Sequence, residues 1–154
     1  MARIKIELPE IFTFTTSIPV RITDINYGGH AGNDSILSMM HEARLQFLGI
    51  HGYTELNVEG IGTIMSDVGI EFINELFYGD VVIASVAAAG FSKVSFELYY
   101  KFEKVPRHHD GFLNHDEKKM LVAVAKTGMV CYDYKKKKIA PLPDQAKKKL
   151  SLVA

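Results

Sequence analysis

T-D-I-N-Y-G-G-H-A-G-N-D, residues 23–34, is a polar stretch with three glycines that runs directly into a segment with helical spacing of apolar residues. It brings carboxylate, carboxamide and imidazole side chains together at the start of that helix. Glycine lets the backbone adopt positive φ or approach a ligand closely. The first N–H groups of a helix are unpaired and carry positive dipole potential. The stretch therefore indicates either a site that holds an oxyanion or a strand-to-helix turn whose Asp and Asn side chains cap the helix.

The segment after this stretch has the periodicity of an amphipathic helix. Its apolar residues recur at i, i+4, i+7 and i+11: Ile36, Met40, Ala43 and Phe47. We expect the helix to begin near Ser35 and to end near His51, where glycines follow. Asn33 or Asp34 is the predicted N-cap. Such a helix must pack its apolar stripe on another element.

Most of the remaining chain has the composition of β-strands. Long runs rich in β-branched and aromatic residues are separated mainly by short turns, and they cover residues 12–22, 61–72, 80–89, 93–103 and 120–134. A short helix is predicted for residues 145–150. The sequence thus predicts an α+β protein in which an antiparallel sheet of about five strands wraps around one long helix. Since no repeat or second domain is recognisable, we expect residues 1–154 to form one domain.

The overall composition narrows the class of protein. Eighteen basic and 18 acidic residues give a formal net charge of zero, which argues against a nucleic-acid-binding protein. No apolar run approaches the roughly 18 residues that span a bilayer, and the N-terminus lacks the pattern of a signal peptide. The single cysteine, Cys131, lies in an apolar run and is expected to be a buried thiol in a reducing compartment. We therefore expect a cytoplasmic protein.

Short motifs follow one another in a fixed order along the chain. They are Asp24, Gly29-His30, Asn33, Glu42-Ala43-Arg44, Ile70-Glu71-Phe72, Tyr78-Gly79-Asp80, Tyr132-Asp133 and Pro141-Leu142-Pro143. Together with the pattern of helix and strands, they resemble the hotdog-fold acyl-CoA thioesterases of the 4-hydroxybenzoyl-CoA thioesterase type. Those enzymes carry a D-x-D-x-x-G-H-x-N-N pattern that leads into a helix with E-E-A-R. The resemblance covers residues 22–150 and implies a hotdog fold and hydrolysis of an acyl-CoA thioester.

The chain departs from that family at one important position. Asn26 stands where many members place a catalytic Asp, so the resemblance supplies no carboxylate base there. A second branch of hotdog thioesterases uses Asn in this place, paired with an acid from the facing subunit, and Asp24-Ile25-Asn26, Gly29 and Ile36-Leu37 are similar to that branch. The resemblance also implies a homodimer or homotetramer that shares its active sites between subunits. It implies an acyl-CoA or acyl carrier protein substrate and no cofactor.

The polar stretch offers several groups for thioester hydrolysis. Backbone amides near Gly29, Asn33 and Asp34 are the predicted oxyanion hole. The Asn26 amide can orient water or the thioester carbonyl, but it cannot act as a base. Asp24 is expected to be structural and to hold the turn by accepting hydrogen bonds from turn amides.

Four residues compete for the role of the base. Histidine is the residue type suited to proton transfer near neutral pH, and His30 lies in the stretch itself, although it could also be a satisfied turn histidine. Glu42 either faces the cleft or forms an ion pair with Arg44 or His41. Asp67 or Glu71 of a facing subunit is the remaining choice.

Two charged segments lie outside these motifs. His108-His109-Asp110 and His115-Asp116 contain potential metal ligands, but no second cluster or helical His pair accompanies them. We therefore expect no native metal site. The run Lys135–Lys138 is either a solvated turn or a contact for the phosphates of CoA.

Two other functions stay open. A hotdog hydratase or dehydratase shows a D-x-N-P-x-H arrangement, which Asp24-Ile25-Asn26 and His30 echo with a longer spacing and no Pro. A non-catalytic acyl-CoA-binding module would have lost its base at Asn26. The helix motif favours the thioesterase over both.

Overall fold

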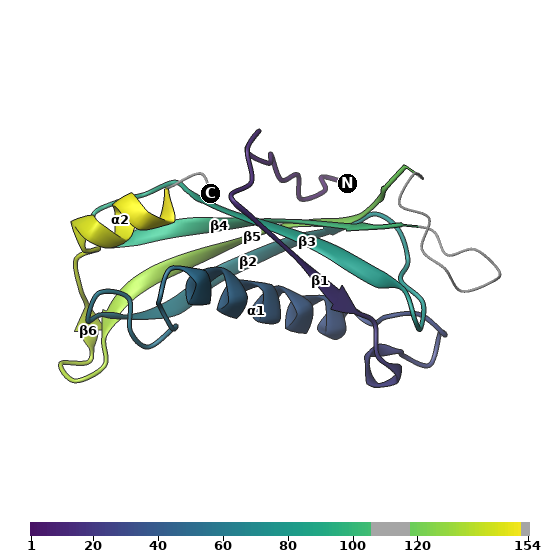
Figure 1. Cartoon of the computed structure of the whole chain (residues 1–154), viewed down its shortest axis with the longest axis horizontal. Helices are drawn as coiled ribbons and strands as arrows, with labels where there is room; N and C mark the ends of the chain where they lie inside the picture. The colour runs from purple at the N-terminus through teal and green to yellow at the C-terminus, as the bar shows by residue number, and fades with distance from the viewer. Residues whose placement is uncertain (106–117, 152–154) are drawn as a thin grey trace.

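The computed structural model describes residues 1–105 and 118–151 and places one long helix against a curved sheet (Figure 1). The elements follow in the order β1 (Phe14–Pro19), η1 (Ile22–Asp24), α1 (Asn33–Ile50), β2 (Gly62–Phe72), β3 (Val81–Ala89), β4 (Ser95–Lys104), β5 (Met120–Asp133), β6 (Lys138–Ile139) and α2 (Asp144–Leu150). The N-terminal segment runs over the face of the sheet that lies opposite α1 (Figure 1).

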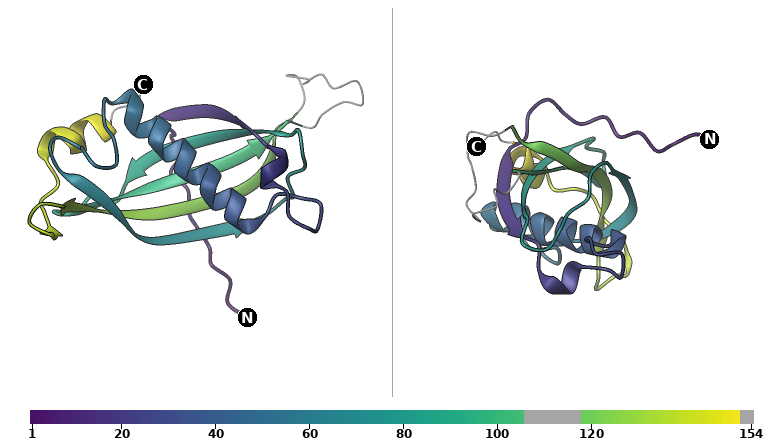
Figure 2. Two further views of the ribbon diagram at one scale, coloured as in Figure 1. Left: turned by 90° about the horizontal axis from the view of Figure 1, so that it is seen from below. Right: turned by 90° about the vertical axis from the view of Figure 1, so that its right-hand side faces the viewer.

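The sheet is antiparallel throughout and has the strand order β1-β3-β4-β5-β2. It curls around α1, as the two views of Figure 2 show. This arrangement confirms the predicted hotdog fold, with one long helix wrapped by a sheet of five main strands. β6 adds two residues beside β5 and was not predicted, because so short a strand has no recognisable period. β1 and β2 form the outer strands of the sheet.

The core lies between α1 and the concave face of the sheet. Large side chains alternate along β4 and face α1 with at most 1% exposure: Phe96, Leu98, Tyr100 and Phe102. The stripe predicted on the helix meets them, with three residues at 0% exposure: Met40, Ala43 and Phe47. Cys131 is also fully buried, and this burial raises the pKa of its thiol to about 11, so the prediction of a buried thiol is confirmed.

The first strand is shorter than predicted. β1 ends at Pro19 and does not continue to residue 22. The chain instead forms the 3-10 turn η1, in which Asp24 Oδ2 accepts the Arg21 N–H at 2.8 Å. An acceptor three residues ahead thus closes a turn where β-branched composition had favoured an extended strand.

The predicted N-cap of α1 is also wrong. Gly32 is the N-cap, with an extended ψ of 162°, whereas Asn33 and Asp34 are already helical. The Gly32 N–H donates to the Asp24 backbone carbonyl at 3.1 Å, and the Ser35 hydroxyl donates to the same oxygen at 2.9 Å. Since η1 packs against the helix start, these contacts take the place of a side-chain cap.

Candidate active site

The residues before α1 form a tight hairpin. The Asn26 N–H donates to the His30 carbonyl at 2.9 Å, and the Gly29 N–H donates back to the Asn26 carbonyl at 3.1 Å. Gly29 has φ +86°, a conformation that favours glycine. The Asn26 Oδ1 accepts the Gly28 N–H at 2.9 Å, so the carboxamide oxygen holds the turn and the amide nitrogen is the group left to donate.

His30 lies in this hairpin with its two ring nitrogens in different surroundings. Nδ1 lies 3.2 Å from the Ala31 carbonyl, which can only accept, so this contact places the proton on Nδ1. Nε2 is then the acceptor nitrogen, and it lies 3.9 Å from Glu75 Oε1. A Cβ on Gly28 would lie 3.4 Å from His30 Nε2 and 3.2 Å from Asn26 Oδ1. The histidine and the carboxamide therefore converge on the bare backbone of Gly28.

A cavity of about 200 Å³ opens where α1 begins. Its walls come from the hairpin, the first turn of α1, the end of β2 and the loop that follows β2. The apolar lining residues include Ala31, Ile36, Phe72, Leu76 and Val122. The polar ones are His30, Asn33, Asn74 and Glu75. Of the predicted site residues, His30 and Asn33 line the cavity, whereas Asn26, Gly29 and Asp34 lie in the adjoining hairpin and helix start.

The first turn of α1 supplies unpaired amides beside this cavity. Gly32 N–H donates to Asp24, and Ser35 N–H donates to the Gly32 carbonyl at 3.1 Å. Within residues 1–105 and 118–151, no acceptor takes the N–H of Asn33 or Asp34. These are the groups that a helix N-terminus leaves free for an anion or an oxyanion.

Asp24 lies behind the hairpin and has 7% exposure. Its carboxylate accepts the Arg21 N–H, and its backbone carbonyl accepts from Gly32 and Ser35. All of these contacts hold the turn and the helix start together, and the carboxylate does not line the cavity.

Glu42 lies on another side of α1. It is exposed and accepts a hydrogen bond from Gln46 Nε2 at 2.8 Å, while Gln46 Oε1 accepts from Thr16 of β1 at 2.6 Å. Neither ion pair considered for it forms, because Arg44 and His41 both contact Glu55, at 2.7 and 3.2 Å. Glu42 therefore faces β1 rather than the cavity, and a catalytic role for it stays a prediction.

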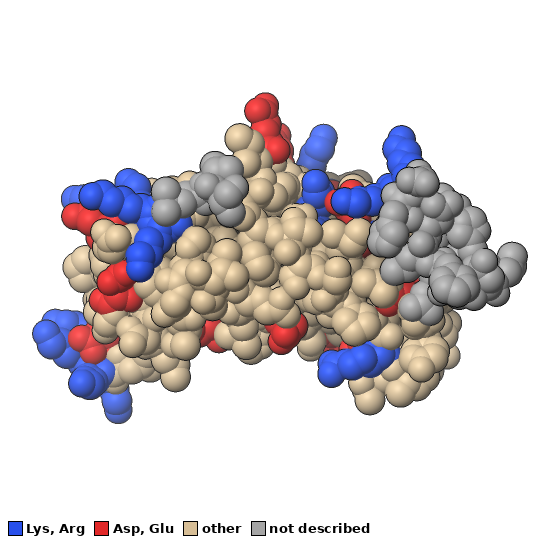
Figure 3. All heavy atoms as spheres, viewed as in Figure 1, with Lys and Arg blue, Asp and Glu red and all other residues tan. Residues whose placement is uncertain are grey.

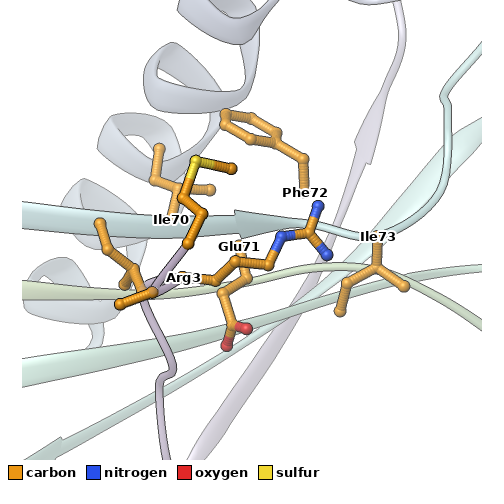
Figure 4. Close-up of a pocket in the computed structure, with 8 residues that line it drawn as sticks. Arg3, Ile70, Glu71, Phe72 and Ile73 are labelled. Atoms are coloured by element: carbon orange, nitrogen blue, oxygen red, sulfur yellow. The ribbon is translucent and has the colours of Figure 1, made fainter.

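The two acids proposed to act from a facing subunit lie on β2. Asp67 is exposed at a bulge of this edge strand, 4.0 Å from Lys126 Nζ. Glu71 Oε2 accepts the Ile6 N–H at 2.8 Å, and its side chain points to the opposite side of β2 from Phe72 (Figure 4). The groove drawn there has a volume of about 630 Å³ and lies between the N-terminal segment and the end of β2. Neither carboxylate reaches the cavity of its own subunit.

The run Lys135–Lys138 lies far from this cavity. Lysines gather at the end of the molecule formed by α2 and β6 (Figure 3). Lys149 of α2 stacks over Tyr53, just beyond the C-terminus of α1, at 5.4 Å from the ring centroid. Since α1 has 18 residues, its two ends lie about 27 Å apart. Within one subunit, the lysine run therefore does not border the candidate site.

Other predicted features concern metals and membranes. His108-His109-Asp110 and His115-Asp116 lie outside the described residues. Among residues 1–105 and 118–151, no cluster of three or more His, Cys, Asp or Glu could hold a metal ion. None of the helices that the structure describes is long and apolar enough to cross a bilayer.

Sequence reasoning missed two polar residues of the cavity, Asn74 and Glu75. Both follow β2 in a short loop and are distant from His30 in the sequence, so no spacing rule connects them with it. The signal that could have drawn attention to them is the polar pair Asn74-Glu75 between apolar residues at the end of a strand.

The fold resembles several solved thioesterases. A 1,4-dihydroxy-2-naphthoyl-CoA thioesterase from Synechocystis is 23% identical, with a TM-score of 0.74 over 89% of this chain and 94% of that one. A 4-hydroxybenzoyl-CoA thioesterase in which an Asp is replaced by Asn, complexed with 4-hydroxybenzoyl-CoA, is 16% identical, with a TM-score of 0.74 over 90% and 98%. The gentisyl-coenzyme A thioesterase BH1999 is 19% identical, with a TM-score of 0.70 over 90% and 100%. At these identities the likeness shows the hotdog fold.

A family comparison is more specific than these likenesses. The family model described as the thioesterase-like superfamily matches residues 20–150, from the polar stretch through α2. Among curated proteins, none matches the chain at a significant level. The family match supports the enzyme class predicted from the sequence, a thioester hydrolase. The chain belongs to the thioesterase-like superfamily.

Proposed function

We propose that this protein hydrolyses an acyl-CoA thioester to the free acid and CoA. The observation that carries the proposal is the cavity at the start of α1, which His30 and Asn33 line next to the unpaired backbone N–H groups of Asn33 and Asp34. Membership of the thioesterase-like superfamily supports the same reaction.

The chemistry needs stabilisation of a developing oxyanion. A thioester carbonyl at the N-terminus of α1 would receive hydrogen bonds from Asn33 and Asp34 as negative charge builds on its oxygen. Loss of one such donor typically costs about 2.7–4 kcal/mol of barrier. The Asn26 amide nitrogen lies beside this site and can orient the carbonyl or a water molecule, since its oxygen is held by Gly28.

The size of the cavity favours a small acyl group. About 200 Å³ lies below the range of about 300–1,000 Å³ that drug-sized ligands occupy. Apolar side chains form much of its wall and include Ile36, Phe72 and Val122. Two of the similar proteins described above are named for the single-ring 4-hydroxybenzoyl and gentisyl thioesters, and the third for the two-ring 1,4-dihydroxy-2-naphthoyl thioester. We therefore propose a single-ring aromatic or short aliphatic acyl group in preference to a long chain.

Edge strand β2 supports a homodimer. It carries apolar side chains that are 38–53% exposed: Ile64, Met65, Val68 and Phe72. A free apolar edge favours pairing with a second copy of the chain. Since Phe72 also lines the cavity, a second subunit on β2 would border the active site and bring Asp67 of its own edge close to the interface. Sedimentation measurement of the mass of the pure protein tests this assembly. A monomer would contradict the dimer, and a tetramer would mean that two such dimers associate.

The decisive experiment incubates the pure protein with a panel of thioesters and measures released thiol. The panel contains short, long and aromatic acyl-CoAs, a 2-enoyl-CoA and an acyl carrier protein thioester. We expect thiol release from saturated and aromatic substrates. The buried Cys131 adds little background because its thiol pKa is raised to about 11. Hydration of the enoyl substrate without thiol release would indicate a hydratase, and tight binding without turnover a binding module.

A further inference from the structure

We infer that Glu75 is a catalytic residue, which together with His30 holds and activates the water that attacks the thioester. The inference rests on the proposed thioesterase function. Glu75 would supply the carboxylate that is absent at Asn26, where many members of the resembled family place a catalytic Asp. Glu75 lies in the loop after β2, on the wall of the cavity that faces the hairpin.

The spacing of the two side chains suits one water molecule. His30 Nε2 and Glu75 Oε1 are 3.9 Å apart, too far for a direct hydrogen bond. A water that donates both of its hydrogens, each over about 2.8 Å, spans two acceptors at this separation. Both atoms are acceptors, because the Ala31 carbonyl places the His30 proton on Nδ1 and a carboxylate has no proton to donate.

The choice of Glu75 follows from where the other acids lie. Of the described residues that line the cavity, Glu75 is the one carboxylate. Glu42 faces β1, and Glu71 is held by the Ile6 amide on the other side of β2. The side chain of Glu75 is 63% exposed in one subunit, so a small solute or a water molecule can reach it.

The loop that carries Glu75 is held from two sides. Lys104, 9% exposed, donates from Nζ to the Glu75 carbonyl at 2.7 Å and to Asp80 Oδ2 at 3.2 Å. The next residue, Leu76, is 1% exposed, and its carbonyl accepts the Ala31 N–H at 2.8 Å. The residues that follow His30 and Glu75 are thus joined directly, which fixes the two walls relative to one another. Such fixed geometry is what positioning of a reacting water requires.

The reaction step balances with these groups. His30 Nε2 takes one proton from the water while Glu75 accepts a hydrogen bond from the other, and the water oxygen forms a bond to the thioester carbonyl carbon. The carbonyl electron pair moves to the oxygen, which the α1 amides stabilise. When the oxyanion collapses, the C–S bond breaks and the thiolate leaves with its electron pair. The imidazolium of His30, stabilised by the Glu75 carboxylate, returns its proton to the thiolate.

The test compares Glu75→Gln with the wild type on the best acyl-CoA of the panel. We expect kcat to fall by about 100-fold, the lower range for loss of a general acid–base group. KM and the affinity for a non-hydrolysable thioether analogue should change by less than about threefold, since Gln keeps the size of the side chain. Glu10→Gln, the same change at an exposed residue of the N-terminal segment, is the matched control and should retain full kcat.

A second variant separates chemistry from folding. In Glu75→Ala, added formate should restore part of kcat, because the free anion can occupy the space of the lost carboxylate. A role limited to holding the loop would give no rescue. If the wild type hydrolyses thioesters and Glu75→Gln retains its kcat, the role of Glu75 is wrong and the proposed function stands. If the wild type releases no thiol from any substrate, the proposed function fails, and the catalytic role of Glu75 fails with it.

Discussion

The first turn of α1 and its middle are both rich in polar groups, but those groups are paired to different degrees. In the middle, Arg44 is 6% exposed and donates to Glu55 at 2.7 Å and to the Tyr100 hydroxyl at 3.3 Å. The Tyr100 hydroxyl in turn lies 2.9 Å from Thr127 Oγ1. At the first turn, the N–H groups of Asn33 and Asp34 have no acceptor among the described residues, and Asn33 and the neighbouring His30 line a cavity. One set of groups is satisfied inside the protein, and the other is open to a ligand.

The pKa shifts of Arg44 and Glu55 show how completely the groups in the middle of α1 are paired. Burial by itself lowers the pKa of Arg44, but the neighbouring Tyr100 and Glu55 outweigh it and raise that pKa. Burial likewise raises the pKa of Glu55, and the hydrogen bonds and charges of Arg44 and His41 outweigh it and lower that pKa. The pair is therefore fully ionised at neutral pH and holds α1 on the sheet. A satisfied buried network contributes to stability and register, whereas reaction requires polar groups that can still accept or donate.

The largest expected effect comes from breaking the satisfied region. Arg44→Met should lower the free energy of unfolding by about 3 kcal/mol, because it removes the buried charged partner of Glu55 and leaves the Tyr100 hydroxyl with Thr127 alone. Urea denaturation measures this loss. The matched control is Arg21→Met, whose side chain is 72% exposed and should change stability by less than about 0.5 kcal/mol. If the free energy of unfolding fell as little in Arg44→Met as in Arg21→Met, the hydrogen-bonded network of Arg44 would not be a source of stability.

Asn26→Ala acts on the open region. We expect thioester turnover to fall by at least about 100-fold while the free energy of unfolding changes by less than about 1 kcal/mol, because the side chain is exposed and its oxygen contacts only Gly28. Steady-state kinetics and urea denaturation of the same preparation separate the two effects. Unchanged turnover would move the reacting centre away from the hairpin.

Gly28→Ala tests the same region with a single methyl group. The new Cβ would lie 3.2 Å from Asn26 Oδ1, a tight contact, and 3.4 Å from His30 Nε2, and we expect a fall of about 10-fold in kcat from a small displacement of the carboxamide. Gly49→Ala is the control, because a Cβ at this position in α1 meets nothing within 4 Å. It should leave kcat unchanged and raise stability by up to about 1 kcal/mol. Equal kcat in both variants would contradict the convergence of side chains on Gly28.

The smallest effect concerns His51 at the C-terminal end of α1. Burial, together with the charge of Lys149, lowers its pKa. The unfolded chain therefore binds more protons than the native state once the pH falls below about 6.5, and stability is lost as the pH decreases. His51→Phe should reduce the loss of stability between pH 7 and pH 5.5 by less than about 1 kcal/mol, a difference that urea midpoints at the two pH values can measure. An unchanged difference would mean that His51 does not contribute.

The sequence predicted the elements because their periods are long and regular. The stripe that includes Met40 and Phe47 repeats over several turns, and the alternation along β4 is continuous, so local pattern and final packing agree. It failed at the junction before α1, where Asp24 closes η1 and Gly32 becomes the N-cap. There, a few backbone hydrogen bonds decide the conformation, and composition does not encode which of several nearby acceptors is used.

The candidate site was predicted in the same uneven way. His30 and Asn33 are close in sequence, and both line the cavity. Glu42 has the residue type of a base, but its direction depends on the rotation of α1 about its axis, which the hydrogen bond between its neighbour Gln46 and Thr16 of β1 reveals. The position of Glu75 depends on a different part of the chain altogether.

The sequence by itself determined the helix, the order of the strands along the chain, the polar stretch before the helix and the family, since each depends on the spacing of residues that are close in the chain. The tertiary structure alone decided which carboxylate stands opposite His30 and how the strands pair within the sheet. The physical reason is that these depend on the pairing of β2 with β5 and on the hydrogen bond between Ala31 and Leu76, contacts between residues far apart in the chain. Only packing brings such residues within the few ångströms at which hydrogen bonds and proton transfer operate.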